Sequence, residues 1–69
     1  MVEIFKTNIE REGTATNLKL ELLEQFPDCK INFDLEDCDR ILRIESAVDI
    51  GREIEKAVTR RGFQCEQLF

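Results

Sequence analysis

Apolar and polar residues alternate along several parts of the chain, and this spacing predicts β-strands. Residues 1–9 are rich in β-branched and aromatic side chains without Gly or Pro, which predicts a first strand. Residues 29–36 alternate strictly between apolar and polar positions, and residues 40–45 predict the second arm of a hairpin. The polar stretch 36–39 is the expected turn of this hairpin, and residues 63–68 predict a short last strand.

Two other stretches repeat their apolar residues with the period of an α-helix. The first is expected to begin at Thr14 as its N-cap and to end before Pro27. The second is expected to begin at Asp49 as its N-cap and to end before Gly62, a residue typical of the position after a helix. The two apolar stripes comprise Ala15, Leu18, Leu22 and Phe26 in the first helix, and Ile50, Ile54, Ala57 and Val58 in the second.

The order strand–helix–strand–strand–helix–strand predicts one α+β domain that spans residues 1–69. With right-handed crossovers, this order gives a ferredoxin-like two-layer sandwich. Its antiparallel sheet has the strand order 4-1-3-2, and both helices cover one face. The expected core comprises Phe5, Leu18, Leu22, Phe26, Ile31, Phe33, Leu42, Ile44, Ile54, Val58 and Phe63.

The composition of the chain argues against several classes of function. A net charge of −5 and a pI of about 4.6 argue against partners such as nucleic acids and anionic membranes. No apolar run has the length of a membrane span. Three widely spaced cysteines do not form a disulfide framework, so we expect free thiols and a cytoplasmic protein. The chain has no histidine and no nucleophile–base motif, so we expect neither catalysis nor a cofactor.

In layout, the whole chain resembles the heavy-metal-associated domains of copper chaperones and metal-transporting ATPases. Ile9 looks like the methionine that ends the first strand of that family, and the first helix stops at a proline, here Pro27. The hairpin over residues 30–45 is similar to the second and third strands of the family. Residues 49–65, with Arg61-Gly62-Phe63 near their end, look like its second helix and closing Gly-aromatic pair.

The metal loop departs from the family. The resemblance implies a CxxC motif after the first strand, but residues 9–14 read Ile-Glu-Arg-Glu-Gly-Thr. They contain no thiolate or thioether, which ions such as Cu(I) require. The metal ligands of the family therefore correspond to no residue of this chain, which is expected to be a degenerate stand-alone member.

The remaining metal candidates lie in the hairpin turn. Cys38 stands there among Glu36, Asp37 and Asp39, which offers a thiolate and carboxylates; the alternative is an ordinary exposed turn. Cys29 and Cys65 are expected among core residues at opposite edges of the sheet, too far apart for a disulfide.

Side-chain alternation also leaves apolar residues on the open face of the sheet. Ile4, Ile41 and Leu68 are expected there beside Arg43, and Phe63 is expected near the former metal loop. These residues suggest a non-catalytic binding module that docks on a protein partner or on a second copy. The alternative is metal binding or transfer through the Cys38 turn.

Overall fold

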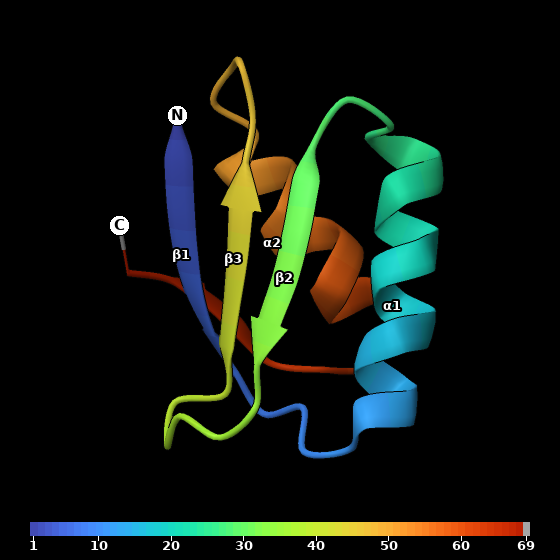
Figure 1. Cartoon of the computed structure of the whole chain (residues 1–69), viewed down its shortest axis with the longest axis vertical. Helices are drawn as coiled ribbons and strands as arrows, with labels where there is room; N and C mark the ends of the chain where they lie inside the picture. The colour runs from blue at the N-terminus through green and yellow to red at the C-terminus, as the bar shows by residue number, and fades with distance from the viewer. Residues whose placement is uncertain (69) are drawn as a thin grey trace.

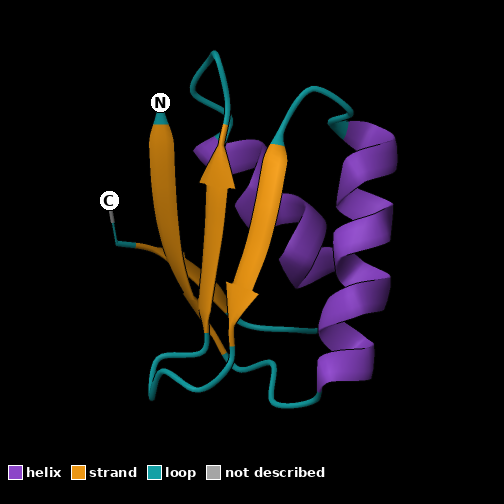
Figure 2. Cartoon of the chain, viewed as in Figure 1, coloured by secondary structure: helices purple, strands orange, loops and turns teal. Residues whose placement is uncertain are grey.

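The computed structural model describes residues 1–68 and contains the six expected elements in the expected order (Figures 1 and 2). They are β1 (Val2–Thr7), α1 (Glu12–Gln25), β2 (Lys30–Asp34), β3 (Ile41–Glu45), α2 (Gly51–Arg60) and β4 (Cys65–Gln67). All strand pairs are antiparallel, in the order β2-β3-β1-β4. This order confirms the predicted ferredoxin-like sandwich.

The register of the sheet follows the alternation of the sequence. Phe5 of β1 lies opposite Leu42 of β3 and opposite Gln67 of β4. In β2 and β3, Ile31 lies opposite Ile44. The apolar members of these pairs point toward the helices and are buried, so the core forms between the sheet and the two helices.

Aliphatic residues dominate that core. It comprises Phe5, Ile9, Ala15, Leu18, Leu22, Ile31, Leu42, Ile44, Ile50, Ile54, Ala57 and Val58. Three aromatic residues predicted to lie in the core, Phe26, Phe33 and Phe63, are only partly buried and pack against its border. Each of them lies near the end of an element, where less structure is available to cover a large ring.

The first helix begins earlier than predicted. Its N-cap is Arg11, and the Ala15 N–H donates to the Arg11 carbonyl at 3.0 Å. Thr14 therefore lies inside the first turn and is not the cap. In the preceding loop Ile9 is buried, and two residues separate it from the helix.

The second helix has the predicted ends with one small change. The N-cap position is Ile50, but the Asp49 carboxylate accepts the Gly51 N–H at 3.1 Å and so provides the expected side-chain cap one residue earlier. At the other end, Gly62 has a φ of 90°. Its N–H donates to the Thr59 carbonyl at 2.9 Å, as expected for a glycine that terminates a helix.

Three strands are clearly shorter than their sequence patterns, and one of them is β1, which covers Val2–Thr7 within the predicted residues 1–9. β2 covers Lys30–Asp34 within the predicted 29–36, and β4 begins at Cys65 where the pattern predicted residue 63. Within residues 1–68, no helix has the length and apolar character needed to cross a membrane.

Candidate functional site

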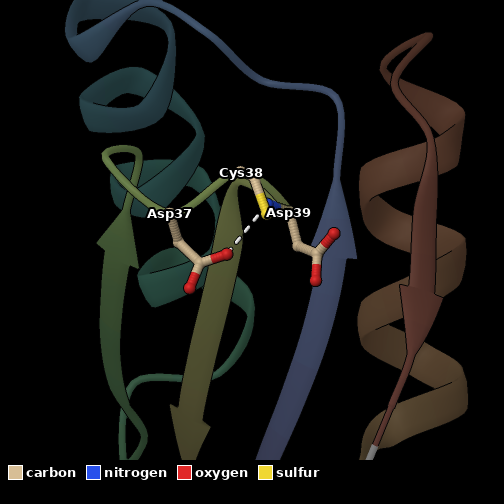
Figure 3. A group of neighbouring side chains, drawn as sticks. All are labelled: Asp37, Cys38 and Asp39. Carbon is tan, nitrogen blue, oxygen red and sulfur yellow. Dashed lines mark hydrogen bonds between the residues drawn. The ribbon is translucent and has the colours of Figure 1, made fainter.

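The turn between β2 and β3 brings together a thiol and two carboxylates. One donor atom each from Asp37, Cys38 and Asp39 lies within 4.8 Å of the others (Figure 3). Asp37 and Cys38 are exposed, and Asp39 is half-buried. Glu36, the fourth candidate of the sequence, does not belong to this three-residue group.

Hydrogen bonds within the turn fix its backbone. The Asp37 carboxylate accepts the Asp39 N–H at 2.8 Å, and the Asp37 carbonyl accepts the Arg40 N–H at 3.0 Å. Arg40 has a φ of 47°, a conformation that permits a tight reversal of the chain. Its guanidinium also donates to the Leu35 carbonyl. The three donor atoms are therefore carried by an ordered turn.

The turn is also attached to the end of β1. The Thr7 N–H donates to the Asp39 carbonyl at 3.0 Å, and the Thr7 hydroxyl donates to the Arg40 carbonyl at 2.6 Å. Figure 1 shows the turn and the β1–α1 loop at the same end of the sandwich. The donor group thus lies at the same end of the sandwich as the β1–α1 loop, for which the sequence resemblance implied a metal motif that this chain lacks.

The loop itself does not fit a copper ion. Its residues, Asn8 to Arg11, offer no sulfur ligand, and the apolar Ile9 is fully buried. The Asn8 amide oxygen accepts the Gln64 N–H at 2.8 Å, which ties the loop to the segment before β4. The loop is thus held to the core by Ile9 and to the segment before β4 by Asn8.

One cation already lies close to the donor group. Lys6 Nζ is 3.7 Å from Asp39 Oδ1, and both side chains are about half exposed, 53% and 41%. Such an exposed ion pair contributes little, about 0–1 kcal/mol. A metal ion could therefore displace the lysine at small cost.

The other two cysteines lie in different surroundings. Cys29 and Cys65 are half-buried against the border of the core, at the two outer strands of the sheet, and all three thiols are free. Burial, and then the nearby Glu55 carboxylate, raise the pKa of the Cys65 thiol to about 12. Cys65 is therefore a thiol at neutral pH, which makes it a poor nucleophile and a poor metal ligand.

The residues proposed for docking occupy two places. Ile4, Ile41, Arg43 and Leu68 lie on the open face, and the Leu68 N–H donates to the Ile4 carbonyl at 2.7 Å. Arg43 stands opposite Ile4 and so interrupts the apolar surface with charge. Phe63 lies away from this face and packs against the border of the core.

Sequence reasoning missed one buried polar residue. Glu3 is 4% exposed and points toward α2 from β1. The sequence contained a signal for this burial, because Glu3 alternates in phase with Phe5, which was expected in the core. A charged residue at an inward position of a strand is uncommon and needs a partner.

Comparison with known proteins gives a fold but no family. No family model matches the chain, and no curated protein matches it. A solved structure described as "Crystal structure of Gold binding protein" has a TM-score of 0.80 and 18% sequence identity. The match covers 94% of this chain and 97% of that chain. At this identity, the similarity shows that the two proteins share a fold.

Proposed function

We propose that this protein is a non-catalytic metal-ion-binding domain whose site is the β2–β3 turn. The observation that carries the proposal is the group of three donor atoms, from Asp37, Cys38 and Asp39, within 4.8 Å. The similar fold of a protein described as gold binding supports it, because a domain of this shape is linked there with a metal.

The donor set favours a borderline divalent ion such as Zn²⁺ over Cu(I). Zn²⁺ accepts one thiolate and two carboxylates, with a water molecule as a fourth ligand, whereas Cu(I) prefers sulfur alone. Zinc bonds of about 2.0–2.3 Å require donor atoms about 3.3–3.8 Å apart in a tetrahedral site. The donor atoms here lie within 4.8 Å, so they would have to move closer together to bind zinc in this geometry.

A zinc titration of the wild type and of a Cys38 variant tests this site. Titration with Zn²⁺ under reducing conditions is expected to show one binding site. The Cys38→Ser variant is expected to bind Zn²⁺ at least about tenfold more weakly, because even the loss of a residue that only hydrogen-bonds a metal ligand changes metal affinity about 10–100-fold. Glu36→Gln is the matched control, because Glu36 lies in the same turn but outside the donor group. Equal affinities of the wild type and Cys38→Ser would exclude the turn as the site.

A second candidate function is docking of a protein on the open face of the sheet. It is favoured by the exposure of two apolar residues beside Ile4, namely Val2 at 45% and Leu68 at 41%. Adjacent exposed apolar side chains often mark interaction surfaces. The partner is another protein or a second copy of this chain.

Charging this face is expected to abolish self-association, because a lysine or glutamate would have to lose its hydration in the interface. The variant is Ile4→Lys with Ile41→Glu, and the measurement is sedimentation at increasing protein concentration. Asn17→Lys, an exposed position of α1 on the helical layer, is the control. If the charged variant folds and associates as the wild type does, the open face is not the interface.

A further inference from the structure

A carboxyl pair joins the first strand to the start of the second helix. Glu3 is 4% exposed, and its carboxyl group interacts with that of Asp49, which is exposed to solvent. Among residues 1–68, no donor reaches Glu3 Oε2. Two ionised carboxyl groups in such a contact would repel each other strongly, whereas a single proton between them makes one the donor and the other the acceptor. A shared proton would replace this repulsion by a hydrogen bond.

Backbone and side-chain groups of two elements surround the pair. At the start of α2, the Gly51 N–H donates to Asp49 Oδ1 at 3.1 Å, and the Ile50 N–H interacts with the Glu3 carboxyl. From β4, the Gln67 side chain also interacts with Glu3 and lies so close to Gly51 that an added Cβ would collide with it. The pair is thus the place where β1, α2 and β4 meet.

The charged groups that face the pair come from α2. The positive charge of Arg52 helps to lower the pKa of the Asp49 carboxylate. Glu55 lies further along the helix and accepts a backbone N–H of β4 at 2.8 Å. From β3, the apolar Ile44 lies opposite Glu3. Burial and Asp49 therefore dominate the surroundings of Glu3.

We propose that Glu3 and Asp49 share one proton and form a pH-sensitive latch, which holds the first turn of α2 and β4 against β1 while the proton is bound. Loss of the proton would place two negative charges at this junction. The elements that separate are then the three-residue strand β4 and the first turn of α2. This inference does not depend on metal binding.

The direction of the pH effect follows from the two carboxyl groups. Burial, and then the Asp49 carboxylate, raise the pKa of Glu3 above its ordinary value. The hydrogen bonds from Glu3 and from the Gly51 N–H lower the pKa of Asp49. Between the ordinary glutamate pKa and the raised pKa of Glu3, the unfolded chain has released this proton while the folded chain still holds it. The free energy of unfolding therefore falls as pH rises through this range, and the latch loses stability. As pH falls through the lowered pKa of Asp49, stability is lost again, and the latch is strongest between these limits.

Urea unfolding of the wild type and of Glu3→Gln over about pH 4 to 8 tests the latch, since a tenfold change in the folding equilibrium constant corresponds to one unit of pKa. Glutamine keeps a donor for Asp49 at every pH. The midpoint of the wild type is therefore expected to fall, relative to that of Glu3→Gln, as pH rises. Glu53→Gln, an exposed residue in the first turn of α2, is the control and is expected to keep the fall of the wild type.

Parallel pH profiles of the wild type and Glu3→Gln would overturn the proposal. If Glu3→Gln does not fold, an NMR titration of the Glu3 carboxyl in the wild type decides, and titration at the ordinary glutamate pKa would contradict a shared proton. Amide exchange, corrected for its intrinsic pH dependence, tests the location. Faster exchange confined to β4 and the start of α2 supports the latch, whereas a uniform change across the sheet contradicts it.

Discussion

Replacing Phe5 by alanine is expected to lower the free energy of unfolding by about 3–5 kcal/mol. Phe5 is fully buried in the central strand β1, where it lies between Leu42 and Gln67. The deleted ring would leave a cavity that surrounding residues cannot fill without moving the sheet. At roughly 0.05–0.15 kcal/mol per residue, a domain of this size has about 3–10 kcal/mol in total. Urea denaturation is therefore expected to find much of the variant unfolded at low denaturant.

Phe33→Ala is the matched control for this experiment. The same atoms are removed, but Phe33 lies in the edge strand β2 and is only partly buried. Its loss is expected to cost clearly less, because solvent can enter the space that the ring vacates. If Phe33→Ala destabilises the domain as much as Phe5→Ala, burial does not determine the energetics of this core.

Installing cysteines at Arg11 and Thr14 is expected to create a Cu(I) site. The two positions have the CxxC spacing, and the structure places Arg11 at the N-cap of α1 and Thr14 in its first turn. Thiols at a helix N-terminus have a lowered pKa because the helix dipole stabilises the thiolate. Two adjacent thiolates supply the soft ligands that the natural loop lacks. Competition with a coloured Cu(I) chelator would measure the gain.

The double variant Arg11→Ser with Thr14→Ser is the control for the gain of copper binding. It has the same loss of the arginine charge and similar side-chain size, but oxygen replaces sulfur. The expected result is one Cu(I) per chain for the cysteine variant and none at the same chelator concentration for the serine variant. Equal competition by both variants would show that the loop cannot bring two thiolates together.

Most of the fold was predictable because two periodicities dominate the sequence. The alternation of Ile31 with its polar neighbours defined the hairpin, and the helical stripe through Leu22 defined the first helix. The start of α1 was not predictable from Thr14, because the helix begins at Glu12, just beyond the buried loop residue Ile9, and has no side-chain cap. A buried anchor in a loop shows no periodic signal, so a cap residue nearby is easily taken as the boundary.

The candidate site was predictable in part. The turn residues Cys38, Asp37 and Asp39 were recognised as neighbours in the sequence, but their common orientation depends on Arg40, whose left-handed backbone no pattern indicated. The pairing of Glu3 with residue 49 requires knowledge of how α2 crosses the sheet. Alternation showed that Glu3 points inward, and only the fold shows what it meets.

The central position of β1 has a consequence for how the chain folds. The β2–β3 hairpin joins residues close in sequence, so loop closure costs it little entropy. By contrast, the pairing of Phe5 with Gln67 joins opposite ends of the described chain. Because contacts between distant residues slow folding, we expect the hairpin to form early and the β1–β4 ladder to form late. A partly folded chain would thus expose one long edge of β1, the part of the molecule most prone to pair with a strand of another chain.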